Sequence, residues 1–185
     1  MPVKIIAGEF RGRNIKCSEG SDVRPTSSMA REAIFNILQQ SGNYRRVLDL
    51  YAGSGALGIE ALSRGAETAV LVEKSAGPAA VIRDNLTMLK ISDRARLHHG
   101  DALDFLKTCG QSFDLILADP PYPDLCLPNI LAAVDEGRTL NEKGMLVIQH
   151  SLKEISAESS GRLKRWKNKR YGKTQVSFYR YNSEG

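Results

Sequence analysis

Long hydrophobic runs are missing from this sequence. None of its apolar stretches approaches the roughly 20 residues that span a bilayer, and residues 1–4 lack the apolar core of a signal peptide. Cysteine is also scarce: Cys17, Cys109 and Cys126 lie far apart and form no C-x-x-C pair. These absences argue against a membrane protein, a disulfide-bonded secreted protein and a zinc site. We therefore expect a cytoplasmic protein with reduced thiols and no bound metal.

Aromatic residues are few, at 6%, whereas the 42% of hydrophobic and 25% of charged residues are ordinary for a soluble globular protein. A chain of 185 residues can bury one full core. We predict a single, monomeric domain over 1–185, with an N-terminal extension over 1–42 and the main core over 43–185. The net charge of +5 is unevenly distributed, which favours a polyanionic partner.

Short apolar runs alternate with helical periodicity from residue 43 onward. We predict strands at 46–51, 68–73, 95–99, 113–118 and 144–149, and helices at 56–64, 75–90, 101–109 and 125–137. This alternation is typical of an α/β fold with a doubly wound, mostly parallel sheet. Residues 163–171 and 174–181 predict an antiparallel hairpin that closes the sheet at the C-terminus.

The N-terminal extension predicts a small β-hairpin over 3–17 and then a helix that starts near Thr26 and ends at Gly42. Met29 belongs to the apolar stripe that we expect this helix to bury. Arg31 and Glu32 are expected on its exposed or half-exposed face.

A glycine-rich stretch at 47–58 organises the chain. Val47, Leu48 and Leu50 predict a buried strand, and Gly53, Gly55 and Gly58 follow with the G-x-G-x-x-G spacing of a nucleotide-cofactor loop. A strand–helix turn that only needs glycine would give the same spacing, so this motif is weak alone.

Two acidic residues indicate which cofactor binds. Asp49 precedes Gly53 closely, where a carboxylate would repel a pyrophosphate but attract a cation. S-adenosylmethionine (SAM) carries a sulfonium and an ammonium group, so Asp49 favours SAM over NAD. Glu73 ends the next strand, at the distance where an acidic side chain accepts hydrogen bonds from ribose hydroxyls. Asp101 either caps the helix that follows it or, with neighbouring amides, reads the adenine edge.

The histidines give no metal site. His98 and His99 are adjacent on a strand and face opposite ways, so we expect them and His150 to be structural or solvated.

The run Asp119-Pro120-Pro121-Tyr122 follows the 113–118 strand and predicts the chemistry. The two prolines make a stiff corner whose carbonyls face a cleft. Asp119 and the Pro120 carbonyl could accept the two N–H groups of an exocyclic base amine and orient its lone pair at the methyl group. Tyr122 could stack on the base. This pattern predicts direct methyl transfer without a covalent nucleophile or metal.

These motifs together resemble the RsmD family of bacterial 16S rRNA guanine-N2 methyltransferases, within the Rossmann-like class I methyltransferases. The matching segments extend over nearly the whole chain: Ile5-Ile6-Ala7-Gly8, Arg11-Gly12-Arg13, Arg24-Pro25-Thr26, residues 31–36, 49–58, 60–66 and 119–122. The resemblance implies methylation of guanine-966 at N2 in the assembling small subunit. At Gln149-His150 the chain departs from a Glu-His pair common in the family, and we assign no catalytic role there.

We predict three groups of site residues. The catalytic group is Asp119, Pro120, Pro121 and Tyr122. The SAM-binding group is Asp49, Tyr51, Ala52, Gly53, Ser54, Gly55, Glu73, Lys74, Asp101 and Ala102. The RNA-binding group is Arg11, Arg13, Arg24, Pro25, Thr26, Arg165, Lys167, Lys169 and Arg170, of which Arg24, Pro25 and Thr26 are implied by the resemblance.

A basic segment at 162–173 supports an RNA partner. Seven basic residues are interleaved there with Trp166 and Tyr171, which suits phosphates and exposed bases. A soluble edge hairpin protected by its lysines would have a similar composition. We expect target choice to rest on RNA shape and bound ribosomal proteins.

Other functions fit less well. A DNA adenine or cytosine amino-methyltransferase would share the chemistry of 119–122, but the chain has no insert for DNA recognition. A protein-glutamine or small-amine methyltransferase would leave the basic segment unexplained. A dinucleotide-binding oxidoreductase would leave 119–122 unexplained, and methyl transfer to any nucleic acid would eliminate a non-catalytic RNA-binding module.

Overall fold

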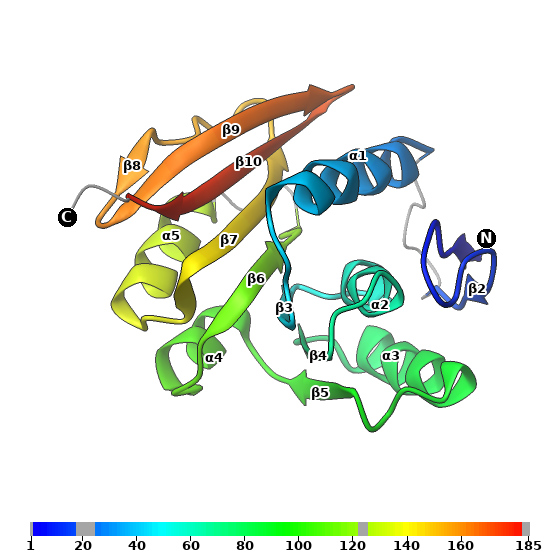
Figure 1. The fold of residues 1–185 in the computed structure, drawn as a ribbon. Helices are drawn as coiled ribbons and strands as arrows, with labels where there is room; N and C mark the ends of the chain where they lie inside the picture. Colours follow the sequence, from blue (N-terminus) through cyan, green and yellow to red (C-terminus); the bar gives the residue numbers. More distant parts are fainter. Residues whose placement is uncertain (1, 18–24, 122–125, 183–185) are drawn as a thin grey trace.

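The fold is an α/β sheet with helices on both faces (Figure 1). The computed structural model describes residues 2–17, 25–121 and 126–182. Its elements in chain order are β1 (Val3–Lys4), β2 (Asn14–Ile15), α1 (Pro25–Ser41), β3 (Arg46–Leu50), α2 (Ala56–Ser63), β4 (Thr68–Glu73), α3 (Ala76–Leu89), β5 (Ala95–His99), α4 (Ala102–Thr108), β6 (Phe113–Ala118), α5 (Leu127–Glu136), β7 (Leu140–Ser151), β8 (Ser159–Ser160), β9 (Leu163–Tyr171) and β10 (Thr174–Tyr181).

The main sheet has eight strands in the order β5-β4-β3-β6-β7-β10-β9-β8. Neighbours from β5 to β7 are parallel, whereas β10, β9 and β8 pair antiparallel. The predicted fold class, with its parallel sheet and closing C-terminal hairpin, is confirmed. None of the helices in the described ranges combines the length and the apolarity that crossing a membrane requires.

Helices α1, α2 and α3 cover one face of the sheet, and α4 and α5 cover the other (Figure 1). The central strands β3 and β6 pack against both layers. Val47 and Leu115 belong to the core under α1–α3, and Leu48 and Ile116 to the core under α4 and α5. Because both faces of these strands are covered, their sequences are almost continuously apolar.

Two details of the main sheet differ from the predictions. β7 begins at Leu140, four residues before the predicted start, because polar side chains near its beginning interrupt the apolar pattern. Asn141 is one of them, and its amide donates a 2.6 Å hydrogen bond to Oδ1 of Asp114 on β6. The two-residue strand β8 was not predicted.

Two predictions on α1 are wrong. Met29 is 69% exposed rather than part of the buried stripe, and Arg31 is only 6% exposed. The buried stripe contains Ala30, Ile34 and Leu38. Arg31 joins it because its guanidinium finds polar partners outside the helix, which helical periodicity cannot reveal. Glu32 is exposed, as expected.

Candidate active site at the carboxyl edge of the sheet

The carboxyl ends of β3, β4, β5 and β6 meet at one edge of the sheet, where ligands of such sheets bind. Leu50 lies opposite Val72 of β4 and opposite Ala118 of β6. The residues that follow these positions are therefore neighbours. The structure brings together there the three predicted acidic residues Asp49, Glu73 and Asp119.

Asp49 is buried, with 1% of the residue exposed. Its Oδ2 accepts a 2.8 Å hydrogen bond from the amide of Gly58, and its Oδ1 has no partner among the described residues. Burial raises the pKa of this carboxyl well above its usual value; the Gly58 hydrogen bond opposes that rise, and the charges of Asp119 and Glu73 add to it. A cation beside Oδ1 would relieve this unfavourable burial.

The loop after β3 turns through three residues with positive φ, namely Tyr51 (57°), Gly53 (58°) and Gly55 (81°). Tyr51 is the non-glycine among them, and backbone strain of this kind clusters at functional sites. The amide of Ala52 donates to the carbonyl of Val72, which fixes the loop to β4. The carbonyl of Ser54 accepts from the Asn85 side chain.

Gly58 is required for a close approach rather than for a turn. A Cβ there would lie 3.1 Å from Oδ2 of Asp49 and 3.2 Å from Cδ2 of Leu71. The absence of that Cβ lets the first turn of α2 bring an amide onto the buried carboxylate.

Glu73 stabilises the loop after β3 through hydrogen bonds to backbone amides. Its Oε2 accepts from the amide of Gly53 (2.9 Å) and its Oε1 from the amide of Ser75 (2.7 Å). A carboxylate has about four lone-pair sites, so these two bonds leave capacity for ribose hydroxyls. The role of Glu73 toward a ribose stays a prediction.

Asp101 is the N-cap of α4. Its Oδ1 accepts from the amides of Leu103 (2.9 Å) and Asp104 (3.3 Å), and Lys74 reaches Oδ2 at 3.3 Å. Burial acts to raise its pKa, but these hydrogen bonds outweigh it and lower the pKa. Of the two predicted roles for Asp101, the structure shows the helix cap. The side chain of Ala102 is buried, so only its backbone could meet a cofactor.

The predicted catalytic run begins directly after β6. Asp119 and Pro121 are exposed and Pro120 is buried, whereas Tyr122 lies outside the described residues. On β7, beside this run, His150 is buried; its Nε2 is 2.8 Å from Oγ of Ser177, and burial lowers its pKa. Of the two predicted alternatives for His150, structural or solvated, burial excludes the solvated one. In the described part of the chain, no group of three or more His, Cys, Asp or Glu side chains could hold a metal.

The N-terminal RNA-binding candidates are only partly visible. Arg24 lies outside the described residues, and Pro25 and Thr26 begin α1. Arg11 is exposed. Arg13 is exposed too, but its Nη2 donates to the carbonyl of Met88 at the end of α3, so part of its guanidinium serves the fold.

The basic residues of β9 do not form one surface. Lys167 and Lys169 lie opposite Phe178 and Val176, which belong to the core under α1. Arg165 and Arg170 lie on the other face, because side chains alternate along a strand and the register shifts between Phe178 and Tyr179. Arg165 also donates to the carbonyl of Ser156, which turns its guanidinium inward. Lys167 and Lys169 are thus better placed for a partner that spans the α1 face.

Sequence reasoning missed two residues that support the site. Asn85 accepts from the amide of Lys16 and donates to the carbonyls of Lys16 and Ser54, which ties the N-terminal segment to the cofactor loop. A signal existed, because Asn85 is polar within the apolar stripe of Ile82 and Leu86. The buried Glu154 accepts from the amide of Leu127 and thereby fixes the start of α5.

A pocket of about 280 Å³ lies elsewhere, between α1, α2 and the amino ends of β3 and β6. Phe35, Tyr44 and Arg64 are among its lining residues. None of the acidic residues of the carboxyl edge lines it, so it is distinct from the candidate active site.

The fold and the acidic carboxyl edge define the class of the protein, the S-adenosylmethionine-dependent methyltransferases. Comparison with known proteins gives the family. The family model "Conserved hypothetical protein 95" matches residues 3–180, and the chain belongs to this family, which is the RsmD family. The predicted RsmD family of methyltransferases is therefore confirmed. The prediction that SAM is the cofactor is confirmed as well.

Individual relatives agree over most of their length. The Bacillus subtilis protein YlbH is 34% identical over 181 residues, which are 96% of this chain and 98% of that protein. Ribosomal RNA small subunit methyltransferase D of Escherichia coli K12 is 32% identical over 147 residues, which are 80% of this chain and 74% of that protein. The solved structure of yhhF from Escherichia coli matches with a TM-score of 0.86 and 28% identity, covering 100% of both chains.

Proposed function

We propose that the protein transfers a methyl group from SAM to the exocyclic N2 of a guanine in 16S rRNA, namely guanine-966, within the assembling small subunit. A similar protein carries the name small subunit rRNA methyltransferase, which supports rRNA as the substrate class. The observation that carries the proposal is the position of Asp119 beside the buried Asp49, whose pKa it raises. A candidate acceptor for the target amine thus adjoins a candidate partner for the positive cofactor. The protein acts as a monomer with one domain over 1–185.

The residues of the edge fit SAM. Oδ1 of Asp49, which has no partner among the described residues, suits the positive charge of the methionine end, and Glu73 retains lone pairs for the ribose hydroxyls. The loop at 51–55 and the Lys74–Asp101 pair complete the candidate walls. When bound, SAM supplies an electrophilic methyl group.

The run at 119–121 performs the substrate half of the reaction. An exocyclic amine is a weak nucleophile because its lone pair is delocalised into the ring. The Asp119 carboxylate and the Pro120 carbonyl accept its two N–H groups, orient the lone pair and stabilise the positive charge that develops on nitrogen. The nitrogen forms the new bond to the methyl carbon as the sulfur–carbon bond breaks, and the amine proton then passes to Asp119 or to water. Tyr122, outside the described residues, is proposed to stack on the guanine.

The test uses tritiated SAM and three acceptors: bare 16S rRNA, small subunits that lack the modification, and duplex DNA. We expect label in N2-methylguanosine from the subunits. Asp119→Ala should lower the rate about 100- to 1,000-fold, the range for losing one preorganised charge-stabilising group. Asp93→Ala removes an exposed carboxylate at the opposite end of the strands and is the matched control.

The identity of the labelled nucleoside decides between substrates. Label in another position of 16S rRNA would overturn guanine-966 but keep rRNA methylation. Label only in DNA would replace the proposal by a DNA amino-methyltransferase. An Asp119→Ala protein with full activity would remove the proposed role of that carboxylate.

A further inference from the structure

Glu60 on α2 is a buried carboxylate that the proposed reaction does not use. Only 1% of the residue is exposed. Its Oε2 accepts a 2.9 Å hydrogen bond from the amide of Ile6, and its Oε1 accepts a 3.1 Å bond from the amide of Ala7. Nε of Arg64 donates to Oε1 at 2.8 Å. One side chain therefore fixes two consecutive amides of the N-terminal arm, which we define as residues 2–17.

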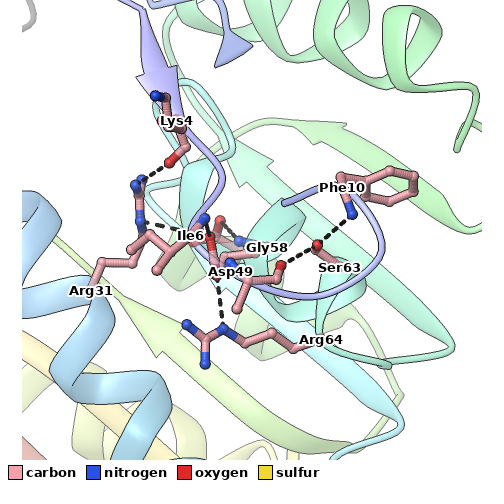
Figure 2. Close-up of polar contacts among 10 residues, drawn as sticks. Lys4, Ile6, Phe10, Arg31, Asp49, Gly58, Ser63 and Arg64 are labelled. Carbon is pink, nitrogen blue, oxygen red and sulfur yellow. Dashed lines mark hydrogen bonds and ion pairs between the residues drawn. The ribbon is translucent and has the colours of Figure 1, made fainter. Parts of the chain in front are cut away.

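The arm is also held from α1. Nη2 of Arg31 donates a 2.7 Å hydrogen bond to the carbonyl of Lys4, and Nε of Arg31 lies 4.0 Å from Oε2 of Glu60 (Figure 2). Burial lowers the pKa of Arg31, and the charge of Glu60 opposes this. Two buried charged side chains, one from each helix, thus clamp the arm.

Ser63 sets the register of this contact. Its Oγ donates to the carbonyl of Ala7 and accepts from the amide of Phe10 (Figure 2). The arm comes so close that a Cβ on Gly8 would lie 1.8 Å from the Ser63 carbonyl oxygen. Two hydrogen bonds and this close approach therefore fix the arm against the end of α2.

The same helix reaches the cofactor edge. The amide of Gly58, two residues before Glu60, donates to the Asp49 carboxylate (Figure 2). The arm is thus tied to the element that holds the cofactor loop. These contacts fix the backbone of the arm, and its exposed basic side chains include Lys4 and Arg11.

We infer that Glu60 is a positioning residue for RNA: it holds the basic arm where Lys4 and Arg11 meet phosphates of the RNA strand that carries the target base. This inference rests on the proposed function and deepens it. Charges that are fixed in advance bind RNA without the entropy cost of ordering the arm. Glu60 itself touches neither RNA nor cofactor.

Glu60→Gln tests this inference, because a neutral side chain cannot pair with both arginines and both amides. We expect the KM for RNA to rise about tenfold while kcat at saturating RNA and the SAM dissociation constant stay within about twofold. The slope of log RNA affinity against log salt should fall by about 0.7 for each phosphate that the arm no longer neutralises. Glu67→Gln, which removes an exposed carboxylate paired with Arg45, is the matched control and should change none of these.

Ser63→Ala provides a second, milder test, because it removes both hydrogen bonds between Oγ and the arm. If Glu60→Gln no longer binds SAM, Ser63→Ala decides: it should raise the KM for RNA in the same direction. An unchanged KM and salt slope in a variant that still binds SAM would overturn the inference, and so would a Ser63→Ala protein that loses as much affinity for SAM as for RNA. Filter binding of 16S rRNA gives the salt slope without methyl transfer. An inactive wild-type enzyme would therefore refute the proposed function alone, whereas a wild-type protein that binds no RNA would refute both.

Discussion

The amide of Gly58 donates a 2.8 Å hydrogen bond to Oδ2 of Asp49, while the other carboxylate oxygen of Asp49 is buried without a partner in the described part of the chain. One oxygen of this carboxylate thus stabilises the fold, and the other oxygen is available to a ligand. Its ionised form is unfavourable in the cofactor-free protein, because burial, Asp119 and Glu73 all raise its pKa. A bound cation would reverse this balance.

Asp49→Asn should separate cofactor binding from folding. The amide has nearly the same shape and its oxygen can still accept from Gly58, but it lacks the charge. We expect SAM affinity to fall about 10- to 100-fold, or about 1.4 to 3 kcal/mol, without a lower melting temperature for the cofactor-free protein. Isothermal titration calorimetry and thermal denaturation measure the two effects. Unchanged SAM affinity would show that Asp49 is not the cation partner.

The pKa of Asp49 also predicts a pH dependence. Its folded-state pKa is raised above the ordinary 3.8, so the cofactor-free protein loses the stability contributed by this group as pH rises from 3.8 through the folded-state pKa. SAM binding needs the ionised form and should weaken as pH falls through the same range. Asp49→Asn does not titrate and should flatten both profiles. A wild-type SAM affinity that does not change between pH 4 and pH 7 would contradict this prediction.

Gly58→Ala should disrupt the hydrogen bond between the Gly58 amide and the Asp49 carboxylate. The added Cβ would press on Oδ2 of Asp49 and on Leu71, at 3.1 and 3.2 Å. Overpacking of this kind costs about 1 to 3 kcal/mol, and the shift should also weaken SAM binding. Gly77→Ala is the control, because a Cβ there has nothing within 4 Å and the site lies in the first turn of α3. Urea denaturation should show the first variant destabilised and the second unchanged or stabilised.

The sequence was sufficient to predict the parts of this molecule that depend on local pattern. Apolar strands, helical periodicity and glycine spacing are read within one segment, so the order of elements and the acidic carboxyl edge could be inferred. The alternatives for Asp101 could not be separated, because a helix cap and a ligand contact need the same residue at the same place. In the structure, the Asp101 side chain caps α4 by accepting hydrogen bonds from the amides of Leu103 and Asp104.

Contacts between distant segments could not be predicted in the same way. Arg31 is charged, and its place in the sequence gave no sign that Lys4 and Glu60 would surround it. Likewise, the composition of the basic segment at 162–173 suggested an RNA contact, but composition does not show how a strand with a register shift divides its side chains between the two faces of the sheet.

The placement of the β9 side chains on two faces of the sheet predicts different roles for Lys169 and Arg170. Lys169 lies on the α1 face of the sheet, the face that also carries the N-terminal arm, and the neighbouring Arg170 lies on the opposite face. If RNA spans the arm and β9, Lys169→Ala should weaken RNA binding and lower the salt slope by about 0.7, the value for one phosphate contact on a single strand. Arg170→Ala removes the same charge from a position that is also exposed and should leave the slope unchanged. Filter binding of 16S rRNA over a series of salt concentrations measures both. Equal losses in the two variants would mean that RNA contacts the rim of the hairpin rather than the α1 face.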